Sequence, residues 1–277
     1  MNTAYAAVQG GEQGAEPSVS DTILHHVQDT NVFEIWPPAV RIPLPEFELL
    51  GIDFSITKHV IMMWVASGLL IAVFTYAFRL SRPVPTGMAN LLEAVVVFLR
   101  DEVILPNMGE AGKRYLPFLL TVFFFILSCN LLGMVPFAAT ATGNIAVTAG
   151  MALIAFTMIQ FGGIKEHGLW HHLKNLVPHG IPFWLLPIMI PVEILGQFAK
   201  PFALCIRLFA NMSAGHIVIL SLLGLSITMQ SVAVGFFLSI PFAIFISLLE
   251  LFVACLQAYI FTMLTSLFMG MSIQPQH

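Results

Sequence analysis

The sequence predicts an all-α polytopic membrane protein. Of its 277 residues, 58% are hydrophobic and 9% are charged, whereas an ordinary soluble domain carries about 25% charged residues. The apolar runs are continuous and reach roughly twenty residues, which is the length that a helix needs to cross a bilayer. They do not alternate with polar residues as the strands of a membrane barrel do. We therefore expect five membrane-crossing helices and one amphipathic interfacial helix, with the last two helices long and strongly tilted.

The N-terminal part differs from the rest in charge. The first 53 residues contain eight acids and one base, Arg41, and the first thirty lack the basic start and apolar core of a signal peptide. We expect residues 1–57 to form a polar acidic segment on the outer side of the membrane. Residues 58–277 are expected to form a single membrane domain.

The first crossing is expected at residues 59–78, where twenty residues carry no formal charge. Two arginines and two prolines follow and end the helix. Residues 86–110 mix apolar residues with Glu93, Arg100, Asp101 and Glu102. This pattern predicts an amphipathic helix lying along the interface. A helix packed against other parts of the protein fits the same pattern.

The second and third crossings are expected at residues 115–137 and 144–164. Tyr115–Ile164 is a run of fifty residues without Asp, Glu, Lys or Arg, and Pro136 and the Gly143-Asn144 pair divide it into a hairpin. The last two crossings are expected at residues 188–223 and 231–270. Each is too long for a straight perpendicular crossing, since 33 residues of helix span about 50 Å and the hydrocarbon core is about 30 Å thick. Strong tilt is the expected solution.

The distribution of basic residues predicts the orientation. Seven bases fall on one side of the five-crossing arrangement, namely Arg79, Arg82, Arg100, Lys113, Arg114, Lys165 and Lys174, and two fall on the other, Arg41 and Lys58. Cytoplasmic loops carry the excess of Lys and Arg. The N-terminus is therefore expected outside and the C-terminus in the cytoplasm.

Arg207 is the most informative single residue. The last 103 positions hold four charged residues: Glu193, Lys200, Arg207 and Glu250. Arg207 is followed by 42 residues without a charge, so it cannot reach the headgroups along its own helix. Arginine stays protonated, and a cation in hydrocarbon costs several kcal/mol. We expect a functional role; a structural cation paired with Glu193 or Glu250 is the alternative.

The helical face around Arg207 is both small and charged. Steps of three, four and seven residues from Arg207 reach Ala203, Lys200, Glu193, Ala210, Asn211 and Ala214. Small residues let another helix approach closely. This face fits a partner helix that bears a carboxylate. Lys200 is the weakest member of the set, because its long side chain can also reach the inner interface.

Two groups that can exchange protons occur in the last two helices, and His216 lies on roughly the opposite side of its helix from Arg207. His216 is nine residues beyond Arg207, about 13 Å along the axis. In the last helix, Glu250 and Gln257 share a face. A buried carboxyl and a buried imidazole can both exchange protons near neutral pH, whereas arginine cannot. This combination suggests a proton path with a barrier in it. Alternatively, His216 is a hydrogen-bonded packing residue, and Asn211 and Gln257 simply bond across helices.

No metal, cofactor or nucleic acid is expected. Cys129, Cys205 and Cys255 lie in apolar spans without a CxxC spacing, which indicates packing residues. The histidines at 167, 171 and 172 are expected at the interface, with metal binding as the alternative. The chain has no Walker loop or other nucleotide motif.

Two segments resemble a known family. The run RLFANMSAGH from Arg207, preceded by Glu193 and the Lys200-Pro201 pair, resembles the signature of subunit a of the F-type ATP synthase. The run LQAYIF from Leu256 resembles the last helix of the same family. The resemblance is strong over residues 191–265 and looser over residues 25–182, where HHVQ, HGL and PHG also fit.

The resemblance implies a role for each candidate residue. Arg207 would be the essential arginine that faces the carboxylates of the rotating c-ring. Asn211 and Gln257 would be the polar pair beside it, and His216 and Glu250 the imidazole and carboxylate of the outer proton path. Some branches of the family place the acid first and the histidine second; this chain has the reverse order. Glu193 would lie at the inner exit, and the role of Lys200 is open.

The function implied is that of a proton-translocating stator subunit in the membrane sector of ATP synthase. Two offset half-channels would lead to the c-ring carboxylates, with Arg207 between them, so that proton flow drives rotation and ATP synthesis. The implied partners are the c-ring, the peripheral-stalk b subunits and the whole complex in a bilayer, here a bacterial plasma membrane. ATP chemistry would lie in the partners. A secondary transporter with internal repeats and a purely structural membrane anchor remain as alternatives.

Overall fold

The computed structural model describes residues 32–35, 40–43, 48–49, 52–53, 57–79, 86–135, 140–168, 185–229 and 235–273. The predictions concerning Arg82, His171, His172 and Lys174 therefore lie outside the described residues.

Two short hairpins in the N-terminal segment were not predicted from the sequence. Strand β1 (Val32–Ile35) pairs antiparallel with β2 (Val40–Pro43), and β3 (Glu48–Leu49) pairs antiparallel with β4 (Ile52–Asp53). In the first pair Glu34 lies opposite Arg41 in the backbone register. Strands of two to four residues leave a weak periodic signal.

The membrane portion is helical, as predicted. Five helical runs are long and apolar enough to cross a membrane: Lys58–Phe78, Met88–Gly133, Ile145–His167, Pro187–Leu222 and Gly235–Ile273. They correspond to helix α3 (Lys58–Phe78), the run that ends with α6 (Gly112–Gly133), α7 (Ile145–His167), α9 (Leu186–Thr228), and the π-helical turn η5 (Gly235–Ser239) with α11 (Ile240–Ile273). This confirms the polytopic all-helical fold class. The placement of the domain boundary at residue 57 stays a prediction.

The predicted interfacial helix leads directly into the second crossing. It consists of α4 (Met88–Phe98), the π-helix η1 (Leu99–Ile104), α5 (Leu105–Met108) and the 3-10 turn η2 (Gly109–Ala111), which leads into α6. Gly109 has φ 59°, a conformation that glycine adopts without strain, and it marks the change of direction.

One face of this segment packs on α11, and its charged face is exposed. Leu99, Val103, Ile104 and Met108 are buried, whereas Glu93, Arg100, Asp101 and Glu102 are exposed. Asn107 in α5 donates a hydrogen bond of 3.1 Å to Ser266 in α11. The alternative of packing on the protein is therefore present in the structure. Location at the membrane interface remains a prediction.

The hairpin between α6 and α7 forms where the sequence predicted a division. Helix α6 ends at Gly133, a 3-10 turn η3 (Ala141–Gly143) follows, and α7 begins at Ile145. The side chain of Asn144 caps α7 by accepting a hydrogen bond of 2.8 Å from the backbone N–H of Ala146. This turn matters for function because it brings η3 next to α9.

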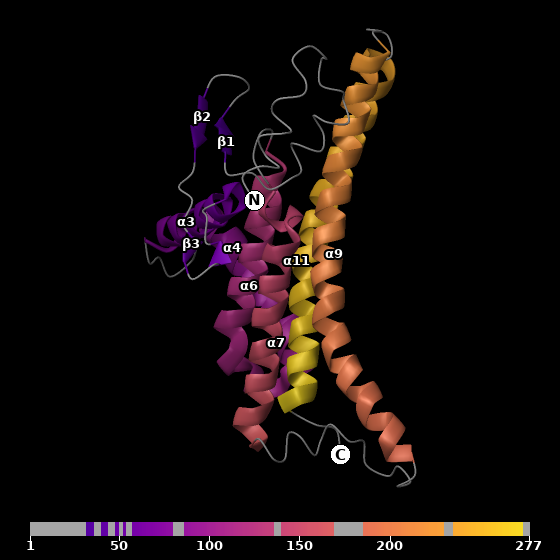
Figure 1. Cartoon of the computed structure of the whole chain (residues 1–277). Coiled ribbons are helices and arrows are strands. Elements are labelled where there is room, and N and C mark those ends of the chain that lie inside the picture. Colours follow the sequence, from indigo (N-terminus) through magenta and orange to yellow (C-terminus); the bar gives the residue numbers. More distant parts are fainter. Residues whose placement is uncertain are drawn as a thin grey trace.

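Helices α6, α7, α9 and α11 form the core of the molecule (Figure 1). Helix α9 has 43 residues and is about 65 Å long; Figure 1 shows it running beside α11 and diverging from it at its N-terminal end. The excess length of the last two helices agrees with the prediction, whereas their tilt against a bilayer stays a prediction. The face that α11 turns toward the core combines large buried residues, such as Phe261 and Met269, with small ones: Ala254, Ala258, Thr262, Thr265, Ser266 and Gly270.

Candidate functional site

The packing of α9 against α11 joins His216 to Glu250, two residues that are 34 positions apart in the sequence. Nδ1 of His216 lies 2.8 Å from Oε1 of Glu250. The Glu250 side chain is 4% exposed, whereas that of His216 is 22% exposed. The sequence predicted both residues as candidates, and the structure places them in direct contact. A buried carboxyl bonded to an imidazole can pass a proton without a large movement of either group.

A glycine on α9 makes room for this contact. A Cβ atom added at Gly215 would lie 2.8 Å from Oε1 and 3.0 Å from Cδ of Glu250, which is closer than van der Waals contact allows. The carboxylate therefore rests against the backbone of α9. Gly215 was not among the residues predicted from the sequence.

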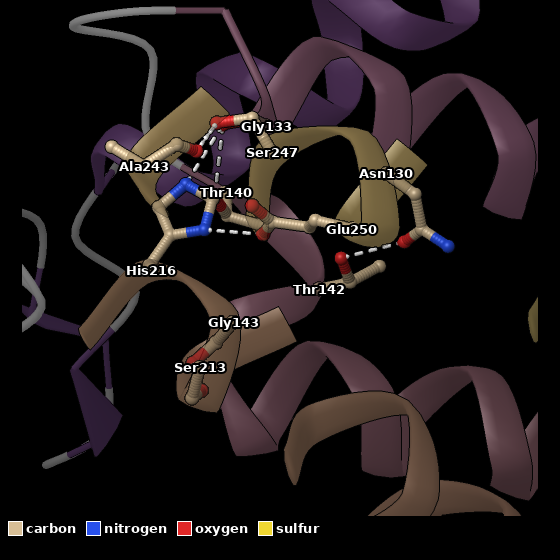
Figure 2. A network of polar contacts seen from close by, with 10 residues as sticks. All are labelled: Asn130, Gly133, Thr140, Thr142, Gly143, Ser213, His216, Ala243, Ser247 and Glu250. Atoms are coloured by element: carbon tan, nitrogen blue, oxygen red, sulfur yellow. Dashed lines mark hydrogen bonds and ion pairs between the residues drawn. The ribbon is translucent and has the colours of Figure 1, made fainter. Parts of the chain in front are cut away.

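The other ring nitrogen of His216 faces the end of α6 and η3 (Figure 2). Nε2 lies 2.9 Å from the carbonyl oxygen of Gly133 and 2.8 Å from Oγ1 of Thr140. The Thr140 hydroxyl also donates to the same carbonyl at 3.3 Å. The imidazole is thus held by α6, by Thr140 directly before η3, and by α11.

Further polar side chains surround Glu250 in an otherwise apolar region. The hydroxyl of Thr142 donates to Oδ1 of Asn130 at 2.8 Å, and Nδ2 of Asn130 donates to the carbonyl of Ala254 at 3.3 Å. Ser213 donates to the carbonyl of Gly143 at 3.3 Å. Figure 2 shows this network reaching from Ser213 past Glu250 to Asn130. Asn130 and Thr142 are fully buried.

Sequence reasoning missed this network, although a signal was present. Asn130, Thr140 and Thr142 all fall within the fifty-residue run that contains no charge. A buried amide or hydroxyl is costly unless it is hydrogen-bonded, so polar residues in such a run indicate partners on other helices. The carbonyl of Gly133 leaves no such signal, because backbone atoms are common to all residues.

Arg207 is half-buried on α9 and makes no hydrogen bond or ion pair with any residue that the structure describes. Glu250, one partner considered from the sequence, is bonded to His216 instead. The other, Glu193, is fourteen residues away on the same helix, about 21 Å along the axis. Beside Arg207, Ala203, Ala210 and Ala214 are exposed. The guanidinium therefore lies at the edge of a small-residue surface on which the described structure places no anion.

Asn211 and Gln257 meet one turn beyond Arg207. Nδ2 of Asn211 donates to Oε1 of Gln257 at 3.1 Å, which realises the cross-helix bond considered from the sequence. Gln257 is 2% exposed. Its Nε2 atom is buried and has no hydrogen-bond partner among the described residues. An unsatisfied buried donor costs about 1–3 kcal/mol, so this position favours an additional acceptor.

Glu193 and Lys200 lie toward the N-terminal end of α9, apart from His216 and Glu250. Both are half-buried. Nζ of Lys200 lies 4.9 Å from the centre of the Phe268 ring of α11, a cation–π contact, so the side chain is directed to the protein. Between them on α9, Gln197 accepts a hydrogen bond of 3.3 Å from Gln160 of α7.

The described residues contain no group of three His, Cys, Asp or Glu side chains that could hold a metal ion. Nε2 of His167 lies 2.7 Å from the carbonyl of Ile273, so this histidine contacts the C-terminal end of α11. Cys129 and Cys205 are buried and Cys255 is exposed, and all three are free thiols.

Comparison with known proteins gives one consistent result. The family model for the ATP synthase A chain matches residues 60–270. ATP synthase subunit a of Pelodictyon phaeoclathratiforme is 50% identical over 277 residues, which cover 98% of this chain and 80% of that protein. ATP synthase subunit a of Myxococcus xanthus is 56% identical over 230 residues, which cover 82% of this chain and 75% of that protein. ATP synthase subunit a 2 of Prosthecochloris aestuarii is 49% identical over 273 residues, 97% of this chain and 84% of that protein.

The family match extends over all five helical runs that are long enough to cross a membrane, and the relatives are similar over most of their own length. The chain therefore belongs to the ATP synthase A chain family and is a multi-pass membrane subunit of ATP synthase.

Proposed function

We propose that this subunit is the stator half of a proton-driven rotary motor, with two offset half-channels that lead to the carboxylates of the c-ring and with Arg207 between them. Membership of the family supports the coarser statement, a proton-translocating role in the membrane sector of ATP synthase. The two routes and the role of each residue are our proposal. The observation that carries it is that Arg207 has no ion-pair partner among the described residues, while His216 and Glu250 are bonded to each other.

The electrostatics of Arg207 favour a partner from another chain. A cation removed from water costs several kcal/mol unless an anion compensates it, and no described residue supplies that anion. The exposed Ala203, Ala210 and Ala214 would let a rotor helix approach closely and bring its carboxylate to the guanidinium. The attraction must remain reversible for rotation, so this site is only partly desolvated. The same positive charge repels a hydrated proton and prevents a direct leak.

The outer half-channel consists of His216, Glu250 and the polar side chains around them. A proton from the outer side reaches the imidazole and carboxyl pair, which are joined at 2.8 Å. Asn211 and Gln257 lie between this pair and Arg207 along α9 and α11. The unused N–H of Gln257 gives water or the rotor site a donor at this point. From here the proton loads a deprotonated rotor carboxylate.

The inner half-channel leads away past Glu193. Glu193, Gln197 and Lys200 lie on one face of α9, and the bond between Gln197 and Gln160 extends this polar face to α7. A proton leaving the rotor after nearly a full turn would pass Glu193 to the cytoplasm. Lys200 is the weakest member of the route, because its ammonium is engaged with Phe268.

The remaining parts of the proposal concern partners and location. The c-ring faces Arg207, the peripheral-stalk b subunits hold this subunit fixed, and ATP chemistry resides in the other sector, so this chain has no catalytic site of its own. The protein lies in a bacterial plasma membrane with its N-terminus outside and its C-terminus in the cytoplasm. Each proton crossing 100 mV releases about 2.3 kcal/mol, which is the driving force for rotation.

The experiment is proton-driven ATP synthesis by the assembled complex carrying Arg207→Ala. We expect synthesis to stop and the membrane to leak protons through the open path. The matched control is Arg100→Ala, since Arg100 is an exposed arginine bonded to Asp101; this variant should retain synthesis. Proton-driven synthesis that persists in the Arg207 variant would refute the proposal. Substrate transport by the chain alone in liposomes would instead support the transporter alternative.

A further inference from the structure

The contact between His216 and Gly133 restricts where the imidazole can carry its proton. Nε2 lies 2.9 Å from the Gly133 carbonyl. A carbonyl oxygen accepts hydrogen bonds and cannot donate one. A bare Nε2 at this distance would place two lone pairs against each other, so Nε2 must carry the hydrogen.

The hydrogen bonds of Thr140 agree with this assignment. Its hydroxyl donates to the Gly133 carbonyl at 3.3 Å, which leaves the oxygen lone pairs free to accept from Nε2–H at 2.8 Å. The opposite arrangement, with the hydroxyl donating to a bare Nε2, would remove one donor from the carbonyl and leave it facing the nitrogen lone pair. The Gly133 carbonyl oxygen, the Thr140 hydroxyl and Nε2 of His216 therefore all have hydrogen-bond partners only when Nε2 carries a hydrogen.

We propose that Thr140, with the Gly133 carbonyl, keeps Nε2 of His216 permanently protonated, so that His216 exchanges protons through Nδ1 and Glu250 alone. Thr140 is then a positioning residue for the outer proton route. The role in transport rests on the proposed function, whereas the protonation of Nε2 does not.

The proton balance follows from this arrangement. The pair holds one proton between Nδ1 and Oε1, either as imidazolium and carboxylate or as neutral imidazole and carboxylic acid. A second proton gives imidazolium with carboxylic acid, and its release restores the starting pair. Transfer through the ring, in at Nε2 and out at Nδ1, would require a bare Nε2 before each proton arrives, and in that state the Gly133 carbonyl lacks the Nε2–H donor.

The surroundings of the ring support a fixed geometry. Glu250 on α11 is the ionisable side chain that contacts His216 among the described residues, while α6 and η3 present the uncharged Gly133 and Thr140. On α9 itself the nearest cation is Arg207, nine residues away. A Cβ added at Gly133 would lie 2.6 Å from Cγ2 of Thr140, so the turn packs tightly and Thr140, 8% exposed, has little freedom to move.

The direct test is nitrogen-15 NMR of the full chain, labelled at histidine and reconstituted in phospholipid bilayers. The signals of His216 are those that disappear in His216→Gln. We expect Nε2 to stay protonated across the pH range in which Nδ1 changes its protonation. A neutral ring with hydrogen on Nδ1 and a bare Nε2 would overturn the proposal, whatever the role of the chain in transport.

The functional test compares Thr140→Val with Thr140→Ser in the assembled ATP synthase. Valine has the shape of threonine without the hydroxyl, so Nε2–H loses one acceptor in both protonation states of the ring, and the loss is larger for the charged imidazolium. We expect the outer proton concentration for half-maximal synthesis to rise about fivefold, the difference between a hydrogen bond from a charged donor and one from a neutral donor, and serine to restore it. An unchanged half-maximal concentration in the valine variant, or a fall in maximal rate alone, refutes the positioning role. Loss of synthesis in Arg207→Ala, measured in the same series, shows that the proposed function itself holds.

Discussion

Gly215 offers a sharp test of the outer proton route, because alanine at this position should impair proton transfer without unfolding the protein. The added Cβ would lie 2.8 Å from Oε1, 3.0 Å from Cδ and 3.4 Å from Cγ of Glu250. The carboxyl group must move away from α9 by several tenths of an ångström. Since His216 is on α9 and its bond to Glu250 is 2.8 Å long, this movement lengthens or breaks that bond.

The expected magnitude follows from the bond that is lost. A hydrogen bond to a charged group contributes about 1.5–3 kcal/mol, which corresponds to a factor of about 10 to 150 in an equilibrium constant. Alanine is favoured over glycine in a helix by about 0.8–1.0 kcal/mol, so α9 itself should not be weakened. We therefore expect proton-driven synthesis to fall by one to two orders of magnitude in a complex that assembles normally.

The assay is ATP synthesis by reconstituted complexes under an imposed proton gradient, with the assembled complex quantified in parallel. Gly150→Ala is the matched control, because Gly150 is also a helical glycine and a Cβ there would meet no atom within 4 Å. The control should behave as the wild type does. The reasoning is refuted when Gly215→Ala synthesises at the wild-type rate, or when Gly150→Ala loses as much activity.

Three further outcomes are expected. Glu250→Gln keeps the shape of the side chain but cannot release a proton, so the rate of proton pumping should fall by a factor of about 10² while assembly stays normal. An unchanged pumping rate would show that Glu250 is not part of the route. Gly270→Ala places a Cβ against the carbonyl oxygen of Asn107, so the thermal stability of the detergent-solubilised complex should fall, consistent with about 1–3 kcal/mol for overpacking. An unchanged melting temperature would contradict the close packing of α5 on α11. Lys200→Met should change synthesis little, because its ammonium contacts Phe268; a loss as large as that of Arg207→Ala would make Lys200 part of the barrier.

The helices could be predicted from the sequence because the bilayer imposes their length and composition. Long runs without charge and the Gly143-Asn144 turn placed the α6–α7 hairpin within a few residues of its observed position. Arg207, Glu193, Lys200 and Glu250 stood out for the same reason, as four charges in 103 residues. The number of charged residues in a segment is a local property of the sequence, so these four residues could be identified without knowledge of how the helices pack.

The pairing of the site residues could not be predicted in the same way. The contact between His216 and Glu250 depends on the register of α9 against α11, which small residues such as Gly215 set through close packing. The Gly133 carbonyl and the Thr140 hydroxyl reach His216 only because η3 folds back toward α9. The sequence left open whether the helix at residues 86–110 lies along the interface or packs on the protein, because the contact of its apolar face with α11 depends on tertiary packing.

A high-resolution structure of the assembled ATP synthase in lipid is the most direct measurement of the central claim, that Arg207 faces a carboxylate carried by a rotating partner. We expect a c-ring carboxylate next to the Arg207 guanidinium, with Ala203, Ala210 and Ala214 against the rotor helix. A guanidinium directed into lipid or bulk water, with no ring beside that face of α9, would contradict it.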